Sequence, residues 1–145
     1  MTQNWCADIN NASRCCTYVN FKTLLNPEKY LNIAIPFNLR KSLACFRCSS
    51  HKLNNEIGRH YGIDKEDRIC LYCFINEDNL IIEDKHHVSF NCPRYDDIRR
   101  NYQFNWYTGP TEVIYFYNIM SIDNENTIRN TALFINKLLK IVKNT

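Results

Sequence analysis

The sequence predicts a small, mainly α-helical domain. The chain has 145 residues, of which 45% are hydrophobic and 13% aromatic, so it can build one apolar core. Apolar residues recur at three- and four-residue steps in two long stretches, near 37–53 and 128–142. Three glycines and four prolines exclude a low-complexity or repetitive chain. We therefore expect a single helical domain over residues 21–145, preceded by a flexible, asparagine-rich N-terminal arm, residues 1–20.

The first helical signals lie on either side of Pro36. Asn26-Pro27-Glu28 predicts the start of a short helix, which should end near Ile33, before Pro36. Pro36 then introduces a longer helix over 37–53. One apolar stripe runs along this helix, made by Leu39, Leu43, Phe46, Ser50 and Leu53.

This helix is basic. Residues 37–60 carry five Lys or Arg against one acid, Glu56, whereas the whole chain has a net charge of +3. Such a charge balance permits an anionic partner but does not demand one. Residues 54–69 are interpreted as a polar connection with turns at Gly58 and Gly62.

The pattern Cys70-x2-Cys73-x13-His87-x4-Cys92 is the most informative feature of the chain. Two thiols, an imidazole and a third thiol at these spacings can close a tetrahedral zinc site from one short stretch of backbone. We therefore expect a CCHC zinc knuckle over 68–93 in the middle of the helical domain. The segments 68–71 and 80–82 resemble two short strands around a turn.

The local structure around the last two ligands is also predicted. Asp84 is expected to cap a short helix that carries His87. A gap of four residues turns two side chains partly apart on a regular helix, so this helix should end or loosen before Cys92, helped by Pro93.

Several alternatives stay open at this point. His86 competes with His87 as the ligand, and Glu83 or Asp84 could accept a hydrogen bond from the ligand imidazole. Unligated core cysteines and a redox dithiol at the CxxC pair are rival interpretations of the thiols.

A second cysteine pair, Cys45-x2-Cys48-x2-His51, lies inside the basic helix. Three ligands on one short helix do not easily surround one ion, so core packing is the favoured interpretation. A second metal site that uses Cys15 or Cys16 is the alternative.

Further helices are expected over 94–143. One begins at Tyr95-Asp96-Asp97, and a second, over 112–120, is apolar almost all round and should be buried. The last helix has one packing seam, formed by Ile128, Ala132, Ile135, Leu139 and Val142. Its lysines are expected on the solvent side.

Residues from Pro36 to Arg100 also follow the pattern of a known family. The matching positions are Ile35-Pro36, Leu39-Arg40, Leu43, Phe46-Arg47, Ser50-His51, Leu53, Glu56, Gly58-Arg59, Arg68, Cys70, Cys73, Glu83-Asp84, His87, Cys92-Pro93 and Tyr95. This stretch resembles the C-terminal region of the reverse transcriptases of LINE-like (non-LTR) retrotransposons. The resemblance implies zinc ligands at Cys70, Cys73, His87 and Cys92, and a knuckle that holds RNA or DNA.

These observations predict a zinc-binding, non-catalytic module that binds RNA or DNA and derives from a retroelement reverse transcriptase. The phosphate-contacting candidates are Arg40, Lys41, Arg47, Lys52, Arg59 and Arg68. Bases could stack on His60, Tyr61 and Tyr72. A protein-interaction module, docking on a reverse transcriptase core or self-associating through its C-terminal helices, is the alternative, and an exposed face on 113–120 would favour it. A weakly folded remnant without function is a third hypothesis.

No catalytic residues are predicted. The chain has no paired-carboxylate, Ser-His-Asp or phosphate-loop pattern, and Tyr95-Asp96-Asp97 is interpreted as a helix start rather than a polymerase motif. At most, the chain would be a fragment of an RNA-directed DNA polymerase without its catalytic portion. The sequence shows no secretory n-region and no membrane-length apolar run, so we expect an intracellular protein, cytoplasmic or nuclear and not secreted.

Overall fold

The computed structural model describes residues 7–8, 17–22, 24–102, 113–121 and 123–143, without the side chains of residues 114 and 115. Most of the predicted N-terminal arm, including Cys15 and Cys16, lies outside the described residues. Regular structure in the described part is helical, in the order η1 (Tyr18–Asn20), α2 (Lys29–Asn32), α3 (Phe37–Arg47), α4 (Asn54–His60), η2 (Lys65–Asp67), α5 (Leu71–Glu77), η3 (His87–Asn91), η4 (Pro93–Tyr95), α6 (Asp96–Asn101), α7 (Val113–Ser121) and α8 (Glu125–Lys143). The predicted mainly α-helical class is thus confirmed.

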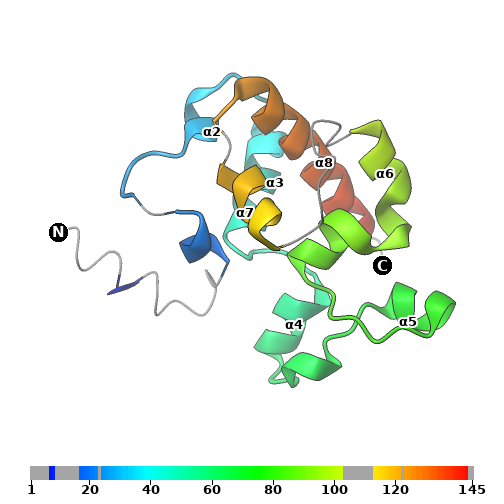
Figure 1. Ribbon diagram of the computed structural model, residues 1–145. Coiled ribbons are helices and arrows are strands. Elements are labelled where there is room, and N and C mark those ends of the chain that lie inside the picture. The colour runs from blue at the N-terminus through cyan, green and yellow to red at the C-terminus, as the bar shows by residue number, and fades with distance from the viewer. Residues whose placement is uncertain (1–6, 9–16, 23, 103–112, 122, 144–145) are drawn as a thin grey trace.

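The described elements form two parts (Figure 1). The larger part, which we call the helical body, contains α2, α3, α6, α7 and α8, with α3 packed along α8. The smaller part, the knuckle lobe, contains α4, η2 and α5 and lies to one side of the body. None of the described helices combines the length and the apolar run that crossing a bilayer requires.

The helical body has an apolar core in which α8 is the central element. Side chains of α3 and α8 that the 3–4 spacing places on one stripe are buried, among them Leu43, Phe46, Ile135 and Leu138. The last helix begins as predicted after Asn124, whose Oδ1 accepts a hydrogen bond from the Thr127 N–H at 3.1 Å. The seam prediction for this helix is confirmed at Ile128, Ala132, Ile135 and Leu139.

The basic helix is shorter than predicted. It ends at Arg47, and Ser49 has a φ of 57°, a left-handed conformation that turns the chain away from the helix axis. The buried Lys85 stabilises this ending, because its Nζ donates to the Arg47 carbonyl at 3.2 Å and to Ser49 Oγ at 2.7 Å. The prediction of a continuous helix over 37–53 is therefore wrong after Arg47, although Leu53 is still buried.

Residues 54–60, interpreted as a polar connection, form helix α4. The first backbone N–H groups of a helix need partners from outside it. Here Glu83 supplies the partners of the first two N–H groups. Its Oε2 accepts from the Asn54 N–H at 2.8 Å, and its carbonyl accepts from the Asn55 N–H at 3.2 Å. Because this cap comes from a residue far along the chain, the sequence near Asn54 contains no sign of a helix start. Residues 54–60 were therefore wrongly predicted to be a connection.

The knuckle lobe contains less β-structure than the sequence suggests. The two expected strands are reduced to one antiparallel bridge between Ile69 and Ile82. The chain between them forms helix α5, which ends at Asp78 in the left-handed conformation, with a φ of 50°. The bridge brings Cys70 against Ile81, whose carbonyl accepts the Cys70 N–H at 2.7 Å.

Candidate metal centre

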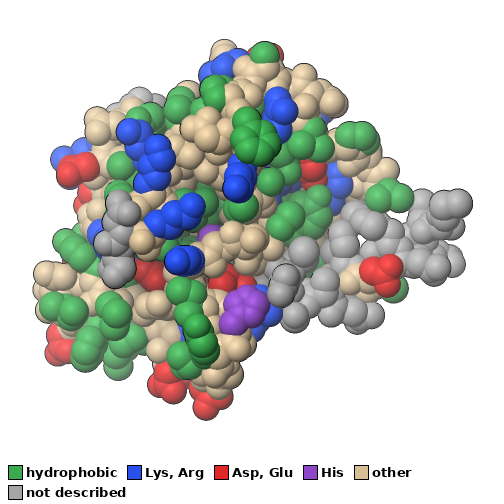
Figure 2. Space-filling model, turned by 180° about the vertical axis from the view of Figure 1, so that it is seen from behind, with side chains coloured by type: hydrophobic (Ala, Val, Ile, Leu, Met, Phe, Trp, Pro, Cys, Tyr) green, Lys and Arg blue, Asp and Glu red, His purple; other side chains and the backbone are tan. Residues whose placement is uncertain are grey.

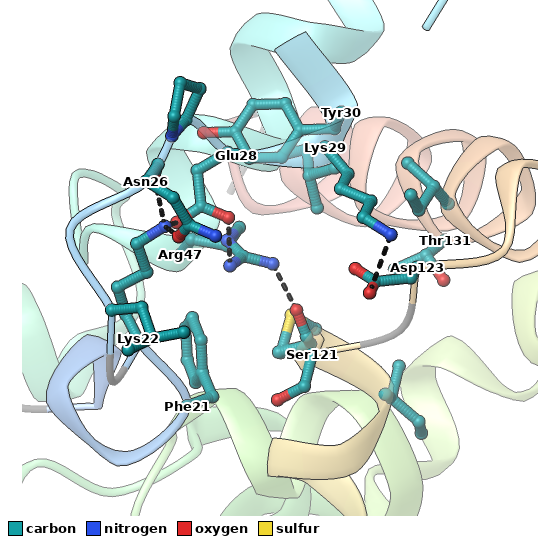
Figure 3. A pocket seen from close by; sticks show the side chains of 16 residues that line it. Phe21, Lys22, Asn26, Glu28, Lys29, Tyr30, Arg47, Ser121, Asp123 and Thr131 are labelled. Carbon is teal, nitrogen blue, oxygen red and sulfur yellow. Dashed lines mark hydrogen bonds and ion pairs between the residues drawn. The ribbon is translucent and has the colours of Figure 1, made fainter. Parts of the chain in front are cut away.

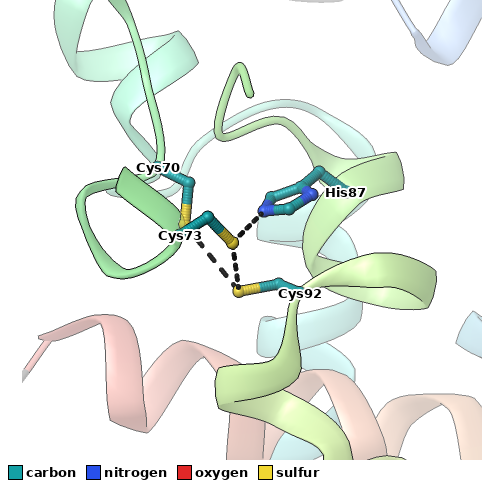
Figure 4. A group of neighbouring side chains, drawn as sticks. All are labelled: Cys70, Cys73, His87 and Cys92. Atoms are coloured by element: carbon teal, nitrogen blue, oxygen red, sulfur yellow. Dashed lines mark hydrogen bonds between the residues drawn. The ribbon is translucent and has the colours of Figure 1, made fainter. Parts of the chain in front are cut away.

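Four buried side chains converge where the knuckle lobe meets the helical body (Figure 4). They are the predicted ligands Cys70, Cys73, His87 and Cys92, and one ligand atom from each lies within 4.8 Å of the others. All three thiols are fully buried, and His87 is almost so. This Cys3His cluster is compatible with a bound metal ion.

The ligand atoms lie close to one another. The Sγ atom of Cys92 lies 3.8 Å from the Sγ atoms of both Cys70 and Cys73. The Nε2 atom of His87 lies 3.4 Å from Cys73 Sγ, so this nitrogen faces the cluster. The neighbouring His86 instead packs against the Phe90 ring, with 5.3 Å between the ring centroids. Of the two histidines, the structure therefore brings His87 into the cluster.

Helix α5 positions the first two thiols. Cys70 is the residue before its first turn and has an extended backbone, and Cys73 lies inside that turn. Their spacing lets both Sγ atoms reach one point while the helix backbone continues past it.

The last two ligands depend on a π-helical turn. Five positions separate His87 from Cys92, which on a regular α-helix would point them about 140° apart. Residues His87–Asn91 instead form a π-helix, and the Cys92 N–H donates to the His87 carbonyl at 2.9 Å. A hydrogen bond over five residues closes one wider turn and returns Cys92 to the side of His87. The prediction that this helix loosens before Cys92 is confirmed.

Two side chains fix the ends of this turn. Asp84 Oδ1 accepts the His87 backbone N–H at 2.8 Å, which confirms the predicted cap. Arg99 of α6 donates to the Val88 carbonyl at 3.2 Å and to the Cys92 carbonyl, and so ties the turn to the helical body. Sequence reasoning missed Arg99, whose only local signal is the i,i+3 ion pair with Asp96.

The expected acceptor for the ligand imidazole is not found. Glu83 caps α4 and Asp84 caps the π-turn, and the buried Nδ1 atom of His87 has no hydrogen-bond partner among the described residues. Of the two roles left open for Glu83 and Asp84, the structure therefore does not show the hydrogen bond to this ring. Both carboxylates act on backbone N–H groups instead.

The thiols differ in their affinity for protons. A hydrogen bond from the Cys92 side chain lowers the pKa of Cys70 well below the ordinary thiol value. Burial raises the pKa of Cys73. The pKa of Cys92 is also raised, mainly by its hydrogen bond with Cys70 and to a smaller extent by burial. Protons therefore compete with a metal ion for the last two sulfurs, since a thiolate and not a thiol is the metal ligand.

The six predicted phosphate-contacting residues have different surroundings in the structure. Arg47 is only 7% exposed. Its guanidinium pairs with Glu28 Oε2 at 2.8 Å, donates to the Met120 carbonyl and lies over the Phe21 ring at 4.6 Å. These contacts make Arg47 part of the core, so we leave it out of any nucleic-acid contact surface.

Three more of the arginines have protein partners. Arg40 donates to the Ile33 carbonyl at 3.0 Å, and Arg59 pairs with Glu56 at 3.1 Å. Arg68 lies against Gly58 and donates to the Ile63 carbonyl at 2.7 Å.

Lys41 and Lys52 are exposed. Of the predicted stacking residues, His60 and Tyr61 are also exposed, Tyr61 to 79%, and Tyr72 is half-buried.

The second cysteine pair shows no sign of a metal site. Cys45 and Cys48 are half-buried thiols, and neither belongs to a metal-compatible group among the described residues. Cys15 and Cys16, the alternative partners, lie outside those residues. Comparison of the chain with protein-family models, with curated proteins and with solved structures gave no match.

Proposed function

We propose that this chain is a zinc-binding, non-catalytic module that binds nucleic acid and is related to the C-terminal region of non-LTR reverse transcriptases. The observation that carries the proposal is the convergence of Cys70, Cys73, His87 and Cys92 at one buried point. These are the same four positions that the retroelement pattern assigns to metal ligands.

Zinc is the metal that suits this donor set best. Three thiolates and one imidazole are ligands of structural zinc sites, and a tetrahedron with Zn–S bonds of about 2.3 Å has sulfur–sulfur edges of about 3.8 Å. The two S–S distances given for the cluster are both 3.8 Å. These two edges match the sulfur–sulfur spacing of a tetrahedral zinc site.

Such a site has a structural role. Protein atoms fill all four corners of the tetrahedron, so no position is left for a water molecule to be activated. The zinc would join Cys70 and Cys73 of α5 to the π-turn and, through Arg99, to the helical body. We therefore expect no polymerase, nuclease or hydrolase activity from this chain alone.

Nucleic-acid binding is supported by exposed charge close to exposed rings. Lys41 and Lys52 are exposed cations, and His60 and Tyr61 are exposed rings at the end of α4. Cations attract the phosphate backbone, and rings stack on bases.

Two measurements on the purified chain test the proposal. Metal analysis of protein prepared without chelator should give one zinc per chain. Binding to single- and double-stranded RNA and DNA, titrated with salt, should weaken linearly on a log–log scale as phosphate contacts are lost. Absence of zinc, or absence of binding to all four nucleic acids at low salt, would overturn it.

A protein-interaction role is the second candidate, and one observation favours it. The knuckle lobe exposes apolar side chains next to each other, including Leu71 and Ile75 one turn apart on α5, with Ile75 75% exposed. Acidic Glu77 and Asp78 follow at the C-terminal end of α5. By contrast, Phe116, Ile119 and Met120 of α7 are buried, so those residues of α7 offer no exposed apolar face.

The partner that fits this face is an amphipathic helix whose apolar side is flanked by Lys or Arg. A peptide of that composition should bind the wild-type chain, and an Ile75→Gln, Leu80→Gln variant should bind it at least tenfold more weakly. A peptide with the same apolar side but an acidic border is the matched control. Equal binding of the two peptides would count against this second candidate.

A further inference from the structure

A groove lies on the helical body between α3 and the C-terminal half of α8, and the turn after α3 closes one end. Its volume is about 670 Å³. It is lined by Asn38, Lys41, Ser42, Cys45, Ser49, Ser50, His51, Lys52, His60, Asn136, Leu139, Lys140, Val142 and Lys143. Ser42 and Asn136 join the two helices across it through a hydrogen bond of 2.9 Å, so the packing of α3 against α8 fixes its shape.

The charges in this groove are all of one sign. Four lysines line it, two from the α3 side and two from α8, and its lining contains no Asp or Glu. None of the four makes an ion pair with another described residue, which is unlike the smaller pocket of Figure 3. In that pocket Lys22 and Arg47 pair with Glu28, and Lys29 pairs with Asp123. The groove is therefore an uncompensated positive site, and its ligand should be an anion.

Figure 2 views the molecule from the side on which α8 lies. Lys and Arg side chains gather on one half of this face around a partly covered histidine, and acidic side chains lie next to this group as well as toward the edges. Within the groove itself, whose lining contains no carboxylate, an anion could contact several of the lysines at once.

Apolar groups in the same groove narrow the chemical class of the anion. The half-buried Val142 and the exposed His60 ring contribute apolar and aromatic surface to the lining, and the buried Leu139 lies beneath them in the wall of the groove. The outside of a duplex offers phosphates and sugars, which gain nothing from apolar surface. A single strand offers phosphates together with unpaired base faces, which pack on apolar and aromatic side chains.

We infer that the groove between α3 and α8 binds single-stranded nucleic acid, with phosphates at Lys41, Lys52, Lys140 and Lys143 and bases against Val142 and His60. This inference rests on the proposed nucleic-acid function and gives it a location. It places half of the phosphate contacts on α8, outside the basic segment 37–60. It also assigns no contact to Arg40, Arg47, Arg59 or Arg68, which have protein partners.

The test compares two triple variants of the full chain that remove the same charge. The groove variant is Lys41→Gln, Lys140→Gln, Lys143→Gln. The control is Lys65→Gln, Arg100→Gln, Lys137→Gln, three exposed cations outside the groove lining. Binding of a uridine homopolymer, of a matched RNA duplex and of poly-glutamate is titrated with salt, and circular dichroism and zinc content report whether each variant is folded.

For the single strand, the groove variant should lose about 2 units of the log–log salt slope, because each phosphate contact contributes about 0.7. Its affinity at low salt should fall at least tenfold, while the control stays within about twofold of the wild type. Cross-links from a 4-thiouridine oligonucleotide should map to peptides of α3 and α8.

Each other outcome has a distinct meaning. If the wild type binds none of the probes, the proposed function itself fails. If it binds nucleic acid but both variants change alike, the nucleic acid binds elsewhere and the groove assignment is overturned. Tighter binding of the duplex would overturn the single-strand assignment, and binding of poly-glutamate alone would assign the groove to an acidic protein segment. An unfolded groove variant leaves the cross-link positions to decide.

Discussion

The helical body and the knuckle lobe are stabilised by different means. In the body, large apolar side chains such as Phe46, Phe134 and Leu138 are fully or almost fully buried. In and next to the lobe, Leu71, Ile75 and Leu80 face solvent, and the buried positions include Cys70, Cys73 and Glu56. Burial of apolar surface is the main favourable term in folding, and the lobe has little of it. The lobe should therefore depend on its metal ion, and the body should not.

The largest effect should follow from removing one metal ligand. Structural zinc contributes on the order of 10 kcal/mol of apparent binding energy in small zinc domains. Cys73→Ser should abolish zinc binding and unfold the knuckle lobe, while α3 and α8 keep most of their helical structure. Limited proteolysis followed by mass spectrometry should show new cleavage within 54–92 and continued protection of 128–139.

Cys45→Ser is the matched control for this ligand variant. Cys45 is a free, half-buried thiol outside the metal cluster. This variant should bind one zinc and keep the wild-type cleavage pattern. If Cys73→Ser also retains zinc, or if the helical body unfolds together with the lobe, the contrast between the two parts is wrong.

A large-to-small change in the body should have the next largest effect. Unlike the ligand variant, it should destabilise the body and leave zinc binding intact. Phe134→Ala removes a buried ring in α8, and such changes typically cost 3–5 kcal/mol. The free energy of unfolding measured by urea denaturation should fall by about that amount, yet the folded fraction should still contain one zinc per chain. Loss of zinc at urea concentrations where the body is still folded would show that the two parts are more tightly coupled than we infer.

Acid should destabilise the junction between the two parts through His51. Burial, assisted by the positive charge of Lys85, lowers the pKa of His51 to about 3. In the unfolded chain its pKa is the ordinary value near 6.5, so between these values the unfolded state binds more protons. The contribution of neutral His51 to the free energy of unfolding is thus fully present above about pH 6.5. As the pH falls below this value, the contribution decreases by about 1.4 kcal/mol per pH unit.

The His51→Asn variant isolates this contribution, because acid also displaces a metal ion from the cluster in both proteins. Urea denaturation at pH 7 and pH 5 should show a fall about 2 kcal/mol larger for the wild type than for the variant. Identical falls in the two proteins would contradict the assignment to His51.

The smallest of these effects concerns packing within the lobe. A Cβ atom on Gly58 would lie 2.6 Å from Cγ of Arg68, whose guanidinium holds the Ile63 carbonyl. Gly58→Ala should displace Arg68 and cost about 1–2 kcal/mol, despite the better helix propensity of alanine. Adding Arg68→Ala removes the clash, so the second change should cost less in the Gly58→Ala background than in the wild type.

The metal ligands could be predicted from the sequence because their geometry is local. Each pair, Cys70 with Cys73 and His87 with Cys92, lies within one turn of chain, and spacing alone limits where the side chains can meet. The packing stripe of α8 was predictable for the same reason. Local patterns thus determined the helical class and the candidate centre.

Features that depend on distant partners could not be predicted in this way. Helix α4 is capped by Glu83, which is 29 positions away from Asn54. Arg47 is part of a basic run in the sequence, but its guanidinium reaches a carbonyl 73 positions away at Met120. The lysines of α8 join those of α3 in one groove only after the two helices pack. Charge counted along the chain therefore found Lys41 and Lys52 but not the lysines of α8 that line the same groove.

The π-helical turn at His87–Asn91 also bears on how such centres vary between related chains. A histidine and a cysteine separated by three residues would face one side of an uninterrupted α-helix, whereas a separation of four requires the wider turn. A single inserted or deleted residue can therefore be absorbed as a change of helix type, without loss of the ligand pair. A search pattern that accepts both spacings describes two backbone geometries that present the same pair of ligands.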